Sequence, residues 1–154
     1  MTEINNLKIQ TKNVVVVGTD GSDAASRAVS YAGSEANVRG SKLLIVHSWF
    51  IPNFGYGSAY VAPINEIEIA AQEVVNKAVE AAKGAFPAIE VEGKLIEGTP
   101  GVRLVEIADE EADIIVIGTR GHGSFTSLLL GSVSAYILHH SKVPVLLVRP
   151  EASH

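Results

Sequence analysis

The sequence predicts an α/β fold with a mostly parallel, five-stranded sheet. Apolar runs short enough to be strands alternate with amphipathic segments of helical spacing, and the runs occupy residues 14–17, 43–46, 89–96, 114–117 and 143–148. Three of these runs consist only of valine, leucine and isoleucine, which is typical of strands buried on both faces of a parallel sheet. Regular strand–helix alternation then indicates right-handed crossovers within one sheet.

The first helix is predicted from Ser22 to about Arg39. Ser22 suits an N-cap, and the helix dipole favours the acidic Asp23 in the first turn. Gly40 is the expected stop, because glycine readily takes the left-handed conformation that ends many helices. Small apolar residues share one face of this segment: Ala25, Ala28, Val29, Ala32 and Ala36.

Two further helices are predicted from their end signals. Pro63 suits the first position of the second helix, and Gly84 is expected to end it. Thr99 and Pro100 have the types expected of an N-cap and a first helical residue, so a third helix is expected from there to about Glu111.

Composition predicts one packed domain. The 154 residues suit a single domain, with a core at about 13–149 and tails at 1–12 and 150–154. Hydrophobic residues make up 47% and charged residues 19%, which excludes a disordered chain. The net charge of -5, without a basic stripe, argues against nucleic acid as a partner.

The chain is expected to be cytoplasmic. It contains no cysteine, which excludes disulfides, thiolate metal sites and thiol nucleophiles. The first residues lack the basic and apolar regions of a signal peptide, so none is expected. No apolar run approaches the ~20 residues that span a bilayer, so no membrane partner is expected.

A glycine-rich stretch from Gly118 to Ser132 is the strongest functional signal. It follows the strand at 114–117 and leads into a short helix predicted at 133–140. Glycines let backbone N–H groups approach an anion, the helix start adds further N–H groups, and the Ser132 hydroxyl supplies one more donor. This arrangement predicts a phosphate site.

Asp20 is predicted to share that site. It follows the first strand, and ligands of doubly wound sheets bind at the carboxyl ends of the strands. Its carboxylate accepts hydrogen bonds, so it suits ribose hydroxyls or adenine donors better than phosphate. Taken alone, Asp20 is better explained as stabilising the turn from Gly18 to Gly21, so both interpretations stay open.

Other polar residues give weaker signals. His47, at the end of a buried strand, is expected to be a hydrogen-bonded core residue. Arg120 and His122 lie in the glycine stretch, where each contacts either phosphate or water. His139 and His140 are expected near a helix C-terminus without a metal. The sequence lacks the motifs of P-loops, dinucleotide-binding turns, nucleophile elbows and zinc proteases.

The last strand predicts a dimer. The run from Val143 to Val148 carries no charge, and Pro144 indicates a sheet edge. A bare apolar edge invites aggregation, and pairing with a second copy would cover it. The alternatives are an internal strand or an edge covered by the N-terminal arm; we favour the dimer.

The chain resembles the ATP-binding universal stress proteins. Gly118, Gly121 and Gly131 with Ser132 match that family's motif of two glycines separated by two residues, then nine residues, then glycine and serine or threonine. The segments 14–22, 129–133 and 143–148 are also similar to the family. The resemblance runs from about Asn13 to Arg149.

This resemblance implies a Rossmann-like three-layer sandwich with strand order 3-2-1-4-5, a homodimer through the last strand and an ATP site. It places adenosine against Asp20 beside Gly18, and adenine at the backbone of Ser48. The resemblance implies that the ribose and phosphates contact the motif residues: Gly118, Gly121, Gly131, Ser132 and Val133.

The expected function is a nucleotide-dependent switch in the stress response. The glycine stretch has no lysine and no evident base, so we expect ATP binding with little or no hydrolysis. Any bound Mg²⁺ would be held mainly by the phosphates themselves. An unidentified protein effector would read the switch. The loop at 49–60 is either part of this switch or a surface excursion.

Two alternatives stay open. One is a sensor of AMP or cyclic AMP that uses the same crevice. The other is an adenylating enzyme of the ATP pyrophosphatase type, which carries an S-G-G-x-D-S-like loop where this chain has the loosely similar residues 18–22.

Overall fold

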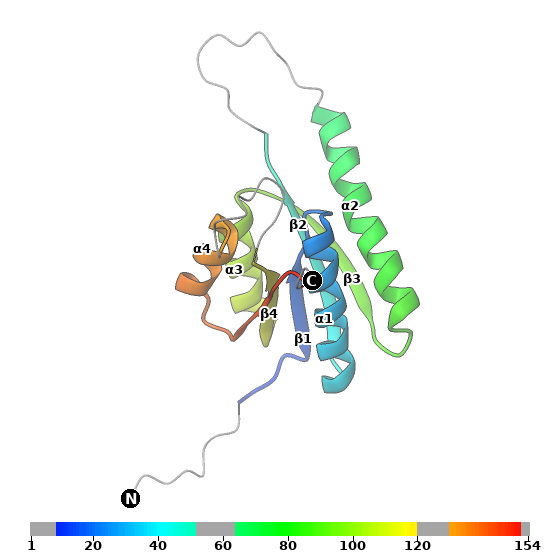
Figure 1. Ribbon diagram of the computed structural model, residues 1–154, viewed down its shortest axis with the longest axis vertical. Helices are drawn as coiled ribbons and strands as arrows, with labels where there is room; N and C mark the ends of the chain where they lie inside the picture. The colour runs from blue at the N-terminus through cyan, green and yellow to red at the C-terminus, as the bar shows by residue number, and fades with distance from the viewer. Residues whose placement is uncertain (1–8, 52–63, 120–129, 152–154) are drawn as a thin grey trace, which may run out of the picture.

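The computed structural model describes residues 9–51, 64–119 and 130–151. Within these residues a five-stranded parallel sheet has the order β3-β2-β1-β4-β5, which confirms the predicted fold class and strand order. Figure 1 shows the sheet and its helices. The elements are β1 (Val14–Gly18), α1 (Asp23–Arg39), β2 (Lys42–Trp49), α2 (Ile64–Ala85), β3 (Val91–Glu97), α3 (Pro100–Glu111), β4 (Ile114–Gly118), α4 (Ser132–His140) and β5 (Val145–Val148).

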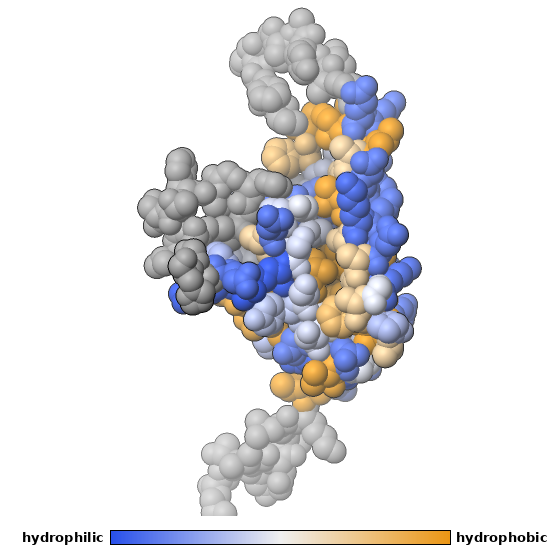
Figure 2. Space-filling view, turned by 45° about the vertical axis from the view of Figure 1, so that its right-hand side comes forward, coloured by the Kyte–Doolittle hydropathy of each residue, from blue (hydrophilic) through white to orange (hydrophobic). Residues whose placement is uncertain are grey.

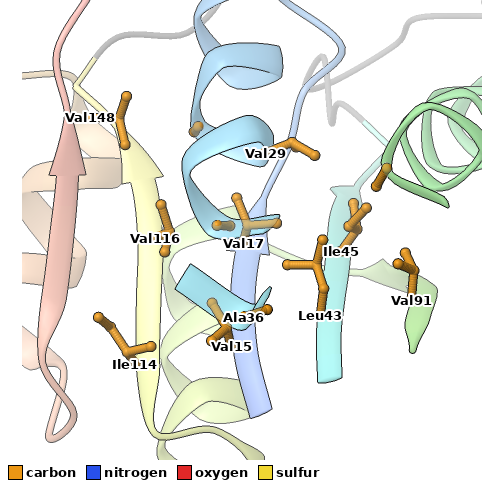
Figure 3. Close-up of a cluster of buried hydrophobic side chains, with 13 residues drawn as sticks. Val15, Val17, Val29, Ala36, Leu43, Ile45, Val91, Ile114, Val116 and Val148 are labelled. Carbon is orange, nitrogen blue, oxygen red and sulfur yellow. The ribbon is translucent and has the colours of Figure 1, made fainter. Parts of the chain in front are cut away.

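The sheet is the middle of three layers. Successive strand residues point to opposite faces, so each central strand feeds two cores. Val15 and Val17 of β1 pack beneath α1 in the cluster drawn in Figure 3. Val16 packs on the other face, with apolar residues of α3 and α4. The chain therefore winds in opposite directions from β1 and from β4, and these two strands are neighbours.

The predicted ends of α1 are confirmed. The Ser22 hydroxyl oxygen accepts the backbone N–H of Ala25 at 3.2 Å, as an N-cap should. Gly40 has φ 64°, and its N–H bonds back to carbonyls of the last turn. Among the helices of the described ranges, none has both the length and the apolar character needed to cross a bilayer.

Some predicted boundaries are wrong. α2 continues through Gly84 to Ala85, because the ring of Phe86 packs on Gly33 of α1 and holds the last turn. The strand predicted from residue 89 starts at Val91, because the Ile89 N–H closes a turn onto the Phe86 carbonyl.

The ends of two other strands also differ from the prediction. β5 starts at Val145 rather than Val143, whose carbonyl instead accepts the Ser141 hydroxyl at 2.8 Å. β2 runs on to Trp49, because its last three residues pair with β3. The predicted start at Pro63 lies outside the described residues.

The contact between α1 and the end of α2 requires glycine. A Cβ at Gly33 would lie 2.1 Å from Cε2 of Phe86, whereas a Cβ at Gly84 would meet nothing within 4 Å. Gly33→Ala should therefore destabilise the fold by about 1–3 kcal/mol through overpacking. Gly84→Ala should stabilise it by roughly 0.5–1 kcal/mol, because alanine restricts the unfolded chain and favours helix.

Urea unfolding followed by circular dichroism measures both variants at one protein concentration. Opposite signs of the change in unfolding free energy are expected. Equal stabilisation by the two substitutions would show that a Cβ at Gly33 does not clash with the ring of Phe86.

Candidate functional site

A pocket of about 220 Å³ opens at the carboxyl edge of the sheet, where β1 and β4 lie side by side. Every predicted site residue in the described part of the chain lines this pocket: Gly18, Asp20, Ser48, Gly118, Gly131, Ser132 and Val133. Gly121, Arg120 and His122 lie outside the described residues. The structure thus brings residues from four separate segments to one place, and their roles in binding stay predictions.

The start of α4 presents backbone donors to the pocket. Gly131 is the N-cap, and it has no side chain with which to cap the helix. Its own N–H donates to the Thr119 carbonyl at 2.7 Å, and the first bond of the helix runs from Ala135 N to Gly131 O at 3.0 Å. The N–H groups of Ser132, Val133 and Ser134 precede that bond, so the helix itself does not pair them.

The start of α1 is closed by side chains. Asp20 accepts the backbone N–H of Ser22 at 2.9 Å, and the same oxygen accepts the Ser22 hydroxyl. Ser22 in turn caps Ala25. The interpretation of Asp20 as a turn-stabilising residue is therefore confirmed. Because Asp20 also lines the pocket, the turn holds a carboxylate at a defined place on the pocket wall.

Ser48 lies where β2 outruns β1. The Val46 carbonyl accepts the Thr19 N–H at 2.9 Å, so Val46 turns its backbone groups toward β1. Backbone groups two residues apart along a strand point the same way, so those of Ser48 turn to the same side, beyond the end of β1. The Ser48 hydroxyl donates to the Gly98 carbonyl at 2.6 Å, which ties the end of β2 to the turn before α3.

The pocket also has an apolar wall that sequence reasoning missed. Leu104 and Pro100 of α3 line it together with Val46 and Ile117. A Cβ at Gly18 would lie 2.8 Å from Cδ1 of Leu104, so glycine lets α3 approach β1 closely. Nothing in the periodicity of α3 separates these residues from ordinary core residues.

Three buried polar residues were missed as well. Thr19 and Thr119, which directly follow β1 and β4, are 8% and 5% exposed, and Ser134 of α4 is 2% exposed. The Thr19 carbonyl lies 2.7 Å from His47 Nδ1, which must donate because a carbonyl only accepts. This bond confirms that His47 is hydrogen-bonded, but its expected place in the core is wrong, because its side chain is only partly buried and lines the pocket. The repeated strand–glycine–threonine pattern was the available signal for the two threonines.

Other charged residues lie away from the pocket. Lys42 and Glu92 form an ion pair that joins the start of β2 to β3, and its hydrogen bond raises the pKa of Lys42 and lowers that of Glu92. His140 Nδ1 lies 2.9 Å from the Tyr136 carbonyl, and the two rings stack. In the ranges that the structure covers, no three acidic or histidine side chains gather as metal ligands.

The chain is similar to proteins of one family. The model of the universal stress protein family matches residues 12–149. A universal stress protein of Thermus aquaticus is 34% identical over 137 residues, which cover 88% of this chain and 97% of the relative. Several mycobacterial relatives are longer proteins, of which the chain spans 45% or less.

Solved structures give the same result. A universal stress protein in complex with cAMP is 36% identical, with a TM-score of 0.69 over 92% of this chain and all of that one. A universal stress protein from Archaeoglobus fulgidus in complex with dAMP is 30% identical, with a TM-score of 0.65 over 86% of this chain and 94% of that one. The family model, the sequence identity and the fold agree, and the chain belongs to the universal stress protein family.

Proposed function

We propose that this chain binds an adenine nucleotide, in the first place ATP, in the pocket at the carboxyl edge of the sheet. The observation that carries the proposal is the start of α4, where a glycine N-cap leaves first-turn N–H groups without a side-chain cap. Asp20 lines the same pocket and supplies the hydrogen-bond acceptor that a ribose needs.

The pocket divides into a polar and an apolar part. Phosphates belong at Gly131, Ser132 and Val133, where donors and the positive end of the helix dipole coincide. The base belongs beside Leu104, an apolar wall, where the backbone of Ser48 reads its polar edge. Ribose then falls between them at Asp20, and Gly118 and Gly121 are assigned to the ribose and phosphates.

A monophosphate sensor is the second candidate function. Relatives have been solved with cAMP and with dAMP. The ionisable residues among the described pocket lining are Asp20 and His47, with neither lysine nor arginine among them. A triphosphate carries more charge than a monophosphate, so ATP would need Mg²⁺ on its phosphates or charge from the residues at 120–129.

The adenylating enzyme is the weaker alternative. Such an enzyme would use residues 18–22 as a phosphate loop. In this structure the Ser22 hydroxyl caps α1, and the backbone N–H of Ser22 donates to Asp20. These groups already have partners within the protein, so they are not available to phosphate. The turn also presents a carboxylate, which repels phosphate. We therefore assign binding with little or no hydrolysis.

Isothermal titration with ATP, AMP and cAMP tests the assignment. Wild-type protein should bind at least one of the three. Gly131→Val should weaken that binding by about tenfold or more, because the valine side chain would block the approach of phosphate to the first-turn N–H groups, and one charge-assisted bond to phosphate is worth roughly 1.5–3 kcal/mol. Gly131 has φ -75° and ψ 166°, which valine also adopts, so the fold should survive.

Gly84→Val is the matched control, since Gly84 lies in α2 with nothing within 4 Å of a Cβ. It should leave the affinity unchanged. Unchanged affinity in Gly131→Val would exclude α4 as the phosphate site, and no binding of any nucleotide by wild-type protein would exclude the proposed function.

The proposed output is a switch read by a protein effector. If ATP changes the glycine stretch and the loop at 49–60, bound ATP should protect these segments from proteolysis. Limited digestion with and without ATP, with cleavage sites identified by mass spectrometry, measures this effect. Identical cleavage in the two samples, at saturating ATP, would contradict the switch.

We also propose a homodimer through β5. This strand is an edge of the sheet, as predicted from Pro144. The carbonyl of Pro144 accepts the N–H of Ile115 in β4, and that of Val148 accepts the N–H of Thr119, which directly follows β4. Residues 144 and 148 thus face β4, and the backbone groups of Leu147 turn to the opposite, outer side. A second copy could pair with that edge across a two-fold axis.

Leu147→Pro tests the dimer, because it removes an outward N–H without breaking a bond to β4. Analytical ultracentrifugation should show a shift from dimer to monomer. Leu147→Val keeps the N–H and should stay dimeric. Equal dissociation constants for the two variants, or a monomeric wild-type protein, would contradict pairing through β5.

A further inference from the structure

The Ser134 hydroxyl links the first turn of α4 to the end of β4. Ser134 is 2% exposed, and its Oγ lies 3.1 Å from the Thr119 carbonyl and 3.2 Å from the Gly131 carbonyl. The hydroxyl has one proton, so the two carbonyls share it in a bifurcated bond. Its contact with Gly131 is local, of a kind that serines often make inside helices. Its contact with Thr119 joins α4 to the residue that directly follows β4.

The Thr119 carbonyl thereby holds α4 at two points. It accepts the Gly131 N–H at 2.7 Å and the Ser134 hydroxyl at 3.1 Å. Thr119 is itself fixed, since its N–H donates to the Val148 carbonyl of β5 at 3.1 Å. The two donors, Gly131 and Ser134, lie three residues apart, and both bond to the Thr119 carbonyl. Together they define the direction of the first turn of α4 relative to the sheet.

A comparison with α1 shows what this arrangement leaves open. In α1 the hydroxyl oxygen of the N-cap Ser22 accepts the N–H of Ala25, the third residue of the helix. In α4 the equivalent N–H belongs to Ser134, and the N-cap glycine has no side chain that could take it. The anchoring hydroxyl thus belongs to the N-cap in α1 and to the third helical residue in α4. In α4 it holds the helix without accepting a first-turn N–H.

We infer that Ser134 is a positioning residue for the nucleotide, acting through Thr119 to aim the N–H groups of the first turn of α4 at the phosphate. This inference rests on the proposed function. It assigns to Ser134 a role in affinity through its hydroxyl and not through packing.

Threonine and valine at position 134 separate these roles, because they share a shape and differ in the hydroxyl. In isothermal titration with ATP and with cAMP, Ser134→Val and Ser134→Ala should bind about threefold to tenfold more weakly than Ser134→Thr, since one neutral hydrogen bond is worth roughly 0.5–1.5 kcal/mol.

Ser141→Ala is the matched control. It removes a hydroxyl-to-carbonyl bond of 2.8 Å, to Val143, at the other end of α4. Ser141→Ala should lower the midpoint of urea unfolding much as Ser134→Ala does and leave nucleotide affinity unchanged. The amide resonances of Ser132 and Val133 in ¹⁵N–¹H spectra of the free protein should shift in Ser134→Val and keep near-native positions in Ser134→Thr.

The outcomes distinguish the two levels of the proposal. If wild-type protein binds neither nucleotide, the proposed function and this inference both fail. If wild-type protein binds and the Thr and Val variants bind equally well, Ser134 acts by packing and only this inference is overturned. Because Thr and Val are compared with each other, a shared loss of stability from the added methyl group does not affect the result.

Discussion

The start of α4 is tied to the end of β4 through the carbonyl of Thr119. This group accepts the Gly131 N–H at 2.7 Å and so sets the first turn of α4 beside the end of β4. Further along, packing holds α4, since Ile137 belongs to the core on this face of the sheet and Tyr136 packs against it. The pocket wall formed by residues 131–133 therefore depends on one buried backbone group together with that packing.

The starts of α1 and α4 lie at the same edge of the sheet and differ in whether a side chain caps them. All helices of a parallel α/β sheet begin at the carboxyl edge, so each is a potential anion site. α1 is capped by Ser22, and Asp20 adds negative charge beside it. α3 begins with Pro100, which has no N–H, but its N-cap Thr99 makes no side-chain bond, so the next N–H groups of its first turn are uncapped as well. α4 therefore differs most clearly from α1, whose start is capped and lies beside a carboxylate, and this difference supports the proposed phosphate site.

Sequence reasoning predicted this fold because hydrophobic periodicity and end signals are local. It failed where a contact between residues far apart in the sequence decides where an element ends. Gly40 and Gly84 both lie near the end of a helix, yet only Gly40 takes the left-handed conformation, with φ 64°. α2 continues past Gly84 because Phe86 finds space on Gly33, which lies more than one element away in the chain. Ser134 was overlooked for the same reason, since its partner Thr119 is fixed only by the fold.

The proposal of binding with little or no hydrolysis agrees with the described lining of the pocket. Acid–base catalysis needs a titratable group that can exchange a proton with the substrate. Of the ionisable residues in the described lining, Asp20 accepts two bonds from Ser22, and His47 donates from Nδ1 to the Thr19 carbonyl. These bonds give both side chains a structural task at the ends of β1 and β2. A wall of oriented donors and acceptors around an apolar patch fits the adenine-nucleotide binding that we propose.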